Sequence, residues 1–263
     1  MLKVAATLAL IASPALATTQ DDVLQAQLRS GWQTENGSHM AALDLTLAPG
    51  WKTYWRSPGD AGIPPSFDWS GSDNVQSVRI HWPAPAVFNL NGMQTIGYSD
   101  RLVLPVEVTP SDPARPVRLR VRMDLGVCDE ICLPASVDLG ADLAAPGAPD
   151  ANIRTALSQR AATAQEAGVT RVSCSIDPIR DGLRLTARLT LPDPGLPEVV
   201  AFETANREIW VAEAVTERRG GELISITELV PPHGAPFALD RSGITMTILA
   251  ANGAVEVKGC PAP

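Results

Sequence analysis

Apolar and polar residues alternate with a period of two along the first half of the chain, which is typical of β-strands that bury one face. The clearest run spans residues 117–125, where Val, Leu and Met occupy the odd positions and Arg and Asp the even ones. Shorter runs of the same kind begin near residues 24, 41, 78, 102 and 137. The turn dipeptide Asn36-Gly37 separates the first two runs and predicts a β-hairpin. The first half is therefore predicted to form an all-β sandwich.

Residues 141–167 interrupt this pattern. The stretch ADLAAPGAPD has the composition of a linker, and Asp150 is suited to cap a helix that follows it. A weak apolar stripe supports a helix over residues 151–167; its members are Ile153, Ala156, Leu157 and Ala161. Strand-like alternation returns near residues 172, 183, 209, 224 and 244. We therefore expect a β-sandwich domain over 18–145, a linker with a short helix over 146–167, and a second, smaller β-sandwich over 168–263.

The first 17 residues have the parts of a secretory signal peptide. Lys3 precedes an apolar run over residues 4–12, and Ala15-Leu16-Ala17 supplies a cleavage site of small residues. No later apolar run approaches the roughly 18 residues of a membrane-spanning helix. We therefore expect cleavage after Ala17 and export of a soluble mature protein.

The formal net charge of −8 argues against nucleic acid or anionic lipid as a partner, because both require basic surface. The sequence has no Ser/His/Asp triad, P-loop or dinucleotide fingerprint, and no cofactor is predicted. The candidate chemistry therefore lies in the four cysteines, which all follow the predicted cleavage site.

An even number of cysteines in an exported protein indicates two disulfides. Spacing favours pairing Cys128 with Cys132 and Cys174 with Cys260. The second pair is 86 positions apart, and closing so long a loop contributes about 4–5 kcal/mol in the chain-entropy model. We predict that Cys174–Cys260 is structural and ties the end of the chain to the first strand of the second domain.

The short pair lies in GVCDEICLPAS, between two predicted strands. A three-residue hairpin loop places Cys128 and Cys132 directly opposite each other, within disulfide range, and a helical turn is the less expected alternative. Such a short loop adds little stability, which favours redox exchange over a purely structural role. Alternation places Cys128 on the polar face unless Gly126 marks a bulge, and in both cases we expect the pair near the surface.

Metal binding by the two cysteines is the other interpretation of this pair. Two thiolates suit Cu(I), and Met93 or a histidine is then needed to complete the site. The three histidines, His39, His81 and His233, are scattered without ligand spacing, and no second Cys or His pair supports zinc. No metal site is predicted.

Acidic neighbours of the pair should also influence its reactivity. Asp124, Asp129 and Glu130 are expected to raise the pKa of the thiols. A raised thiol pKa suits a carrier that reacts slowly with stray thiols and exchanges with a docked partner. Solvated loop acids without this role are the alternative.

Four stretches together resemble the N-terminal periplasmic domain of the thiol:disulfide interchange protein DsbD and its ScsB-type relatives. They are GWKTYWRSPGDAGIPPSFDW (50–69), IHWPAP (80–85), GYSDRLVLPVEV (97–108) and GVCDEICLPASVDL (126–139). The resemblance covers residues 31–140 and implies an immunoglobulin-like fold. The second half is only loosely similar to the additional β-domain of longer relatives. The expected fold class is therefore all-β, with two immunoglobulin-like β-sandwich domains joined by a linker with a short helix.

The resemblance also implies roles for residues. Cys128 and Cys132 correspond to the redox pair, with Cys132 as the thiol that attacks partners. A cap loop over residues 87–92 would place Phe88 or Leu90 as an apolar lid over the sulfurs, although Phe88 is equally suited to be an ordinary core aromatic. Trp51, Tyr54 and Trp55 are expected to be core or loop-anchoring aromatics.

In this family the pair receives electrons from a membrane-embedded transporter and reduces periplasmic thioredoxin-like or disulfide-isomerase proteins. This sequence contains neither the transmembrane channel nor the thioredoxin-like domain of full-length DsbD, so we expect a separate DsbD/CcdA-like membrane donor. The expected function is that of a periplasmic thiol:disulfide oxidoreductase. The alternative is a non-catalytic binding module with structural disulfides or a Cu(I)-binding pair linked to copper tolerance.

Overall fold

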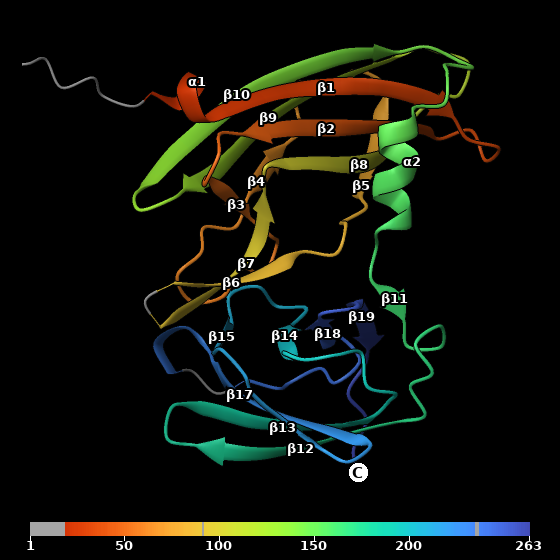
Figure 1. Ribbon diagram of the computed structural model, residues 1–263. Helices are drawn as coiled ribbons and strands as arrows, with labels where there is room; N and C mark the ends of the chain where they lie inside the picture. The colour runs from red at the N-terminus through yellow and green to blue at the C-terminus, as the bar shows by residue number, and fades with distance from the viewer. Residues whose placement is uncertain (1–18, 91, 235–236) are drawn as a thin grey trace, which may run out of the picture.

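The computed structural model describes residues 19–90, 92–234 and 237–263 as two stacked β-sandwiches (Figure 1). The predicted signal peptide lies outside the described residues. One sheet of the first sandwich has the order β1 (Leu24–Gln33), β2 (His39–Leu47), β8 (Arg101–Pro110), β5 (Val75–Ile80). The other has the order β10 (Cys132–Leu143), β9 (Val117–Cys128), β3 (Lys52–Tyr54), β7 (Met93–Ser99), β6 (Ala86–Leu90), and β4 (Ser66–Asp68) also pairs with β9.

The second sandwich is built in the same way from two sheets. The first has the order β11 (Ala162–Thr163), β19 (Gly253–Lys258), β18 (Thr245–Ala250), β14 (Val199–Glu203). The second has the order β12 (Arg171–Ile179), β13 (Gly182–Thr190), β17 (Glu222–Val230), β15 (Trp210–Val211), and β16 (Val215–Arg219) pairs with β17. The helices are α1 (Gln20–Val23), α2 (Ala151–Ser158) and the 3-10 turn η1 (Pro232–Gly234). The predicted all-β class with a short helix is confirmed.

The first core follows the predicted alternation. Residues at odd positions of β2 and β9, such as Leu43 and Met123, are buried between the two sheets. The Asn36-Gly37 turn connects β1 to β2 as predicted. The outer face of β2 is buried as well, because Ile153 of α2 packs against Ala42. This second contact explains why β2 departs from simple alternation of buried and exposed residues.

The helix prediction is correct at its start and wrong at its end. Asp150 caps α2, since its carboxylate accepts hydrogen bonds from the backbone N–H groups of Asn152 (2.7 Å) and Ile153 (3.2 Å). The helix ends at Ser158 rather than near residue 167. Residues 162–163 instead pair as a strand with β19, and this pairing with a distant part of the chain replaces further helical turns.

Cys174 of β12 forms a disulfide with Cys260, which follows β19, and both residues are buried in the second core. The backbone N–H of Cys174 also donates to the carbonyl of Pro261 (2.7 Å). Together these bonds attach the last residues of the chain to the second sandwich.

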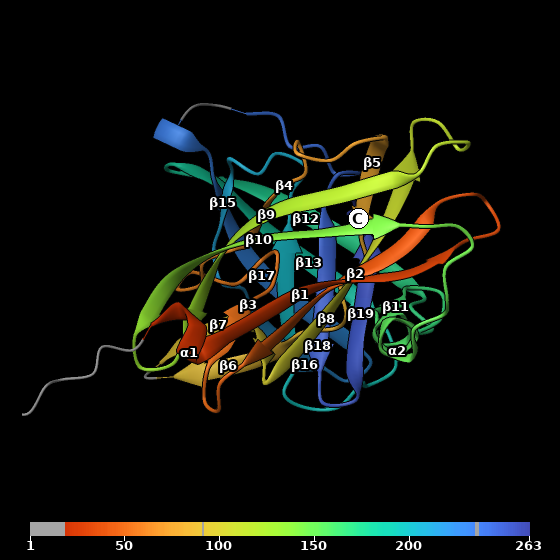
Figure 2. The same cartoon turned by 90° about the horizontal axis from the view of Figure 1, so that it is seen from above.

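The two sandwiches touch through apolar side chains. Ala201, Leu249 and Ala254 of the second sandwich belong to the same buried cluster as the core of the first. Seen from above, strands β1, β9 and β10 lie over β12, β13 and β18 (Figure 2). Within the described part of the chain, no helix is long and apolar enough to cross a membrane.

Candidate functional site

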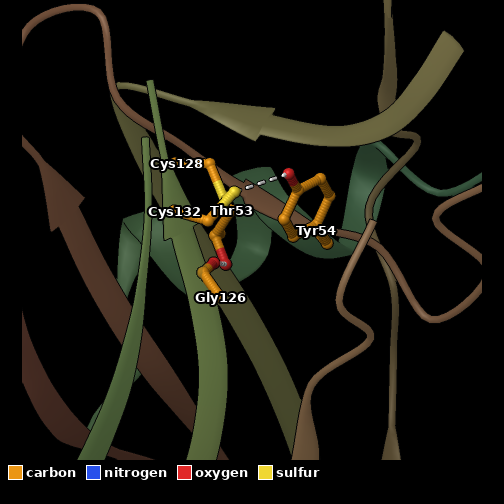
Figure 3. The surroundings of a disulfide bond; sticks show 5 residues. All are labelled: Thr53, Tyr54, Gly126, Cys128 and Cys132. Carbon is orange, nitrogen blue, oxygen red and sulfur yellow. Dashed lines mark hydrogen bonds between the residues drawn. A yellow bond between two sulfur atoms is a disulfide. The ribbon is translucent and has the colours of Figure 1, made fainter. Parts of the chain in front are cut away.

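The short cysteine pair closes the hairpin between β9 and β10. Residues 129–131 form its three-residue loop, Cys128 and Cys132 are direct cross-strand partners, and their Cα atoms are 4.1 Å apart. The two residues form a disulfide (Figure 3). The pairing register is unbroken along the whole hairpin, so Gly126 does not mark a bulge. Cys128 therefore lies on the outer face of its sheet, as alternation predicts.

Near Cys128, the outer face of β9 is nevertheless covered by other residues. Cys128 is only 1% exposed, whereas Cys132 is exposed. Tyr54 and Ile63 lie over the same face at Gly126, two positions before Cys128: a Cβ atom added to Gly126 would lie 3.2 Å from Cε2 of Tyr54 and 2.9 Å from Cβ of Ile63. The pair thus lies near the surface as expected, with Cys132 exposed and Cys128 buried beside it. An incoming thiolate has access to one sulfur of the disulfide and not to the other.

Tyr54, which the sequence predicts to be a core or loop-anchoring aromatic, also contacts the disulfide. It is buried, and its hydroxyl donates to the sulfur of Cys132 across 3.7 Å (Figure 3). Burial raises the pKa of the Tyr54 phenol, which keeps the hydroxyl protonated and able to donate. The hydroxyl of Thr53 donates to the carbonyl of Gly126 (2.9 Å) and fastens β3 to β9. The sequence carries no local signal for the contact of Tyr54 with Cys132, because the two residues are 78 positions apart in the chain.

Lys52 and Phe88 lie on the same outer face. Lys52 is the cross-strand partner of Cys128, and its ammonium lies 5.3 Å from the centre of the Phe88 ring. The segment predicted as a cap loop is a strand, β6, up to Leu90, because it pairs with β7. The structure places the Phe88 ring against Lys52, and its role as a lid stays a prediction. The side chain of Leu90 lies outside what the structure describes.

Of the three acidic residues near the cysteine pair, the structure shows polar partners for Asp124. Asp124 accepts a hydrogen bond from the hydroxyl of Ser136 and lies 3.8 Å from the guanidinium of Arg122. Asp129 and Glu130 are exposed in the hairpin loop. Their expected effect on the thiol pKa stays a prediction.

The candidate metal ligands are dispersed. Among the described residues, no three His, Cys, Asp or Glu side chains group as metal ligands do. His81 contacts the carboxylate of Glu107 (3.2 Å), and His39 is buried, which lowers the pKa of its imidazole. Met93 is exposed at the start of β7.

Comparisons with known proteins identify the family and the fold. Residues 20–143 match the family described as thiol:disulfide interchange protein DsbD, N-terminal. The crystal structure of the N-terminal periplasmic domain of ScsB from Proteus mirabilis is similar over 94% of this chain and 96% of its own, with a TM-score of 0.71 and 23% identity. At this identity the likeness shows a shared fold, which includes both sandwiches. No curated protein matches the chain.

The matched residues contain the whole β9–β10 hairpin with its disulfide, the cover residues Tyr54 and Ile63, and the strands that position them. Residues 20–143 therefore form a thiol:disulfide interchange domain. Through residues 20–143, the chain belongs to the family of the DsbD N-terminal domain.

Proposed function

We propose that this protein is a periplasmic thiol:disulfide oxidoreductase that carries reducing equivalents in the Cys128–Cys132 pair. Its donor is a membrane-embedded transporter of the DsbD/CcdA kind, and its acceptors are thioredoxin-like or disulfide-isomerase proteins. The family match and the likeness to a periplasmic domain support this proposal. We further propose that residues 1–17 are removed on export and that the redox domain spans residues 18–145.

One observation carries the proposal: the disulfide closes a loop too short to be an effective staple, and only one of its cysteines is exposed. In the reducing step, a donor thiolate attacks the sulfur of Cys132 and breaks its bond to Cys128, which leaves as a thiolate and takes up a proton. The second donor thiolate attacks the donor's own sulfur in the mixed disulfide and releases Cys132. Two electrons have then passed from the donor dithiol to the pair.

The oxidising step reverses these roles. The Cys132 thiolate attacks the acceptor disulfide, and one acceptor sulfur leaves. The buried Cys128 thiolate then attacks the sulfur of Cys132, which releases the reduced acceptor and restores the Cys128–Cys132 disulfide. The 4.1 Å between the two Cα atoms keeps the resolving cysteine beside the attacking one.

A redox titration of the mature protein in glutathione and dithiothreitol buffers tests this function. We expect the short pair to be reduced between about −120 and −270 mV, the range of known exchange proteins, and the long pair to resist reduction to about −300 mV. A Cys128→Ser/Cys132→Ser variant assigns the two transitions. Equal resistance of both disulfides contradicts the proposal, and tight Cu(I) binding by the reduced pair at one ion per protein favours the metal-binding interpretation instead.

A further inference from the structure

The segment from Tyr54 to Arg56 links the disulfide to the second sandwich. At one end, the Tyr54 ring fills a slot between two glycines: an added Cβ would lie 2.9 Å from the ring at Gly62 and 3.2 Å from it at Gly126. The slot holds the Tyr54 hydroxyl beside the Cys132 sulfur. The position of this segment therefore decides whether the hydroxyl reaches the sulfur.

At the other end, Arg56 joins the second sandwich through three short contacts. Its Nε and Nη2 atoms donate to both carboxylate oxygens of Glu203 (2.8 and 2.9 Å), and Nη2 also donates to Glu256 (2.9 Å). Glu203 ends β14 and Glu256 lies in β19. All three side chains are partly buried, and a two-pronged contact of this kind holds its geometry better than an exposed ion pair.

Only Trp55 lies between Tyr54 and Arg56, and its position is restrained by packing and hydrogen bonds. Its side chain is buried in the first core, and the guanidinium of Arg56 stacks 4.4 Å from its ring. Its backbone N–H donates to the carbonyl of Ile96 (3.0 Å), whose own N–H donates to the carbonyl of Pro58 (2.9 Å). Arg56 and Tyr54 are thus connected through a single restrained residue.

We propose that the contacts of Arg56 with Glu203 and Glu256 make the second sandwich part of the redox site, because they hold Tyr54 in hydrogen-bonding position on Cys132. Arg56, Glu203 and Glu256 are positioning residues that act through Tyr54. In the reduced protein, the hydroxyl then stabilises the attacking thiolate of Cys132 and lowers its pKa. This inference rests on the proposed function and assigns a role to the second sandwich.

Other charges also act on the Cys132 thiolate. Asp129 and Glu130 lie in the hairpin loop between the two cysteines. Asp124 lies on the same face of β9 as Cys128, and Lys52 lies on β3 opposite Cys128. None of these residues changes in the test below. Differences between its variants therefore report on Tyr54 and on the contacts of Arg56.

The test measures the pH dependence of iodoacetamide alkylation in a Cys128→Ser background, where Cys132 is the one reduced cysteine. The midpoint of the profile is the pKa of the Cys132 thiol, and the plateau at high pH reports access. We expect Glu203→Gln/Glu256→Gln to raise the midpoint and to slow alkylation at pH 7 about threefold, which corresponds to half a pKa unit. Tyr54→Phe should have at least this effect, and adding it to the Gln pair should give no more than Tyr54→Phe alone.

The sign of the shift separates positioning from simple electrostatics. Removing two carboxylates by itself favours a nearby thiolate and lowers the thiol pKa, which is opposite to the expected result. A matched control is Glu222→Gln/Glu228→Gln, which removes two ion pairs of the second sandwich, with Arg188 (3.2 Å) and Arg184 (2.9 Å). This control should leave the midpoint unchanged.

An unchanged or lowered midpoint in the Glu203/Glu256 variant overturns the inference, as does a shift that adds fully to that of Tyr54→Phe. Near-ultraviolet circular dichroism and an intact Cys174–Cys260 disulfide verify folding. If the double variant fails this check, Glu256→Gln alone replaces it and must shift the midpoint in the same direction. Alkylation needs no redox partner, so failure of the proposed exchange function in the glutathione titration is a separate result.

Discussion

The hydroxyl of Tyr54 lies 3.7 Å from the sulfur of Cys132, on the one cysteine of the short disulfide that a partner can reach. A buried, protonated phenol is a good donor to a thiolate and a poor one to a disulfide sulfur. The contact therefore favours the reduced state of the pair whenever Cys132 is ionised. The ring of the same side chain packs over Gly126, on the face of β9 that also carries Cys128.

Replacement of Tyr54 by Phe removes this donor and keeps the ring. We expect the equilibrium constant for reduction by glutathione to fall about threefold at pH 9, where the thiolate is populated, because a hydrogen bond to a charged group is lost. The fall should be smaller at pH 6. A quantitative alkylation assay over a series of glutathione buffers measures both values, and an equal effect at the two pH values contradicts the thiolate explanation.

Single Cys→Ser variants should differ strongly in reactivity. Cys128→Ser leaves the exposed Cys132 as a thiol, whereas Cys132→Ser leaves the buried Cys128. We expect Cys132 to react with an aromatic disulfide reagent at least about tenfold faster, since access to the thiol limits the rate at a buried sulfur. Stopped-flow absorbance gives the two rate constants, and equal values contradict the asymmetry on which the direction of attack rests.

Gly126 leaves room for the cover over the disulfide. In Gly126→Ala the new methyl group meets Cβ of Ile63 at 2.9 Å, so the cover must shift. We expect a loss of about 1–3 kcal/mol in the free energy of unfolding, together with faster reduction of the short pair by dithiothreitol. Gly71→Ala is the control, because its nearest neighbour is the side chain of Arg120 at an ordinary 3.5 Å. Urea denaturation that shows equal stability for the two variants contradicts this prediction.

The buried carboxylate of Asp44 makes stability depend on pH. Arg101 donates two hydrogen bonds to it (2.8 and 2.9 Å) and, with Arg29, lowers the pKa of Asp44 to about 2 from an ordinary value of 3.8. A lowered pKa stabilises the fold at pH values above about 4. This contribution, about 2 kcal/mol, is lost as the pH falls towards 2.

In Asp44→Asn we expect a loss of stability at pH 7 and a flatter dependence on pH between 4 and 2. Urea denaturation at a series of pH values measures both. Asp73→Asn, in an exposed ion pair with Arg115 (3.4 Å), serves as the control and should change neither quantity noticeably. A variant at position 44 with the full acid dependence of the parent contradicts the assignment to Asp44.

Local sequence patterns were enough to predict the alternating strands, the cap at Asp150, and the hairpin that pairs two cysteines four positions apart. These follow from the alternation of side chains, from turn and cap chemistry, and from short loops. The end of α2 was not predictable in this way, because residues 162–163 pair with a strand more than 90 positions away.

The exposure of the two cysteines, in contrast, depends on contacts between distant parts of the chain. Alternation tells which face of a strand is polar, and it is silent about what covers that face. Tyr54 and Ile63 lie over Gly126 on that face, and the ion pair two residues after Tyr54 joins residues 147 positions apart, Arg56 and Glu203. Contacts of this length depend on how sheets and domains stack, which is why the sequence predicted the redox pair but neither its one-sided exposure nor the part played by Tyr54.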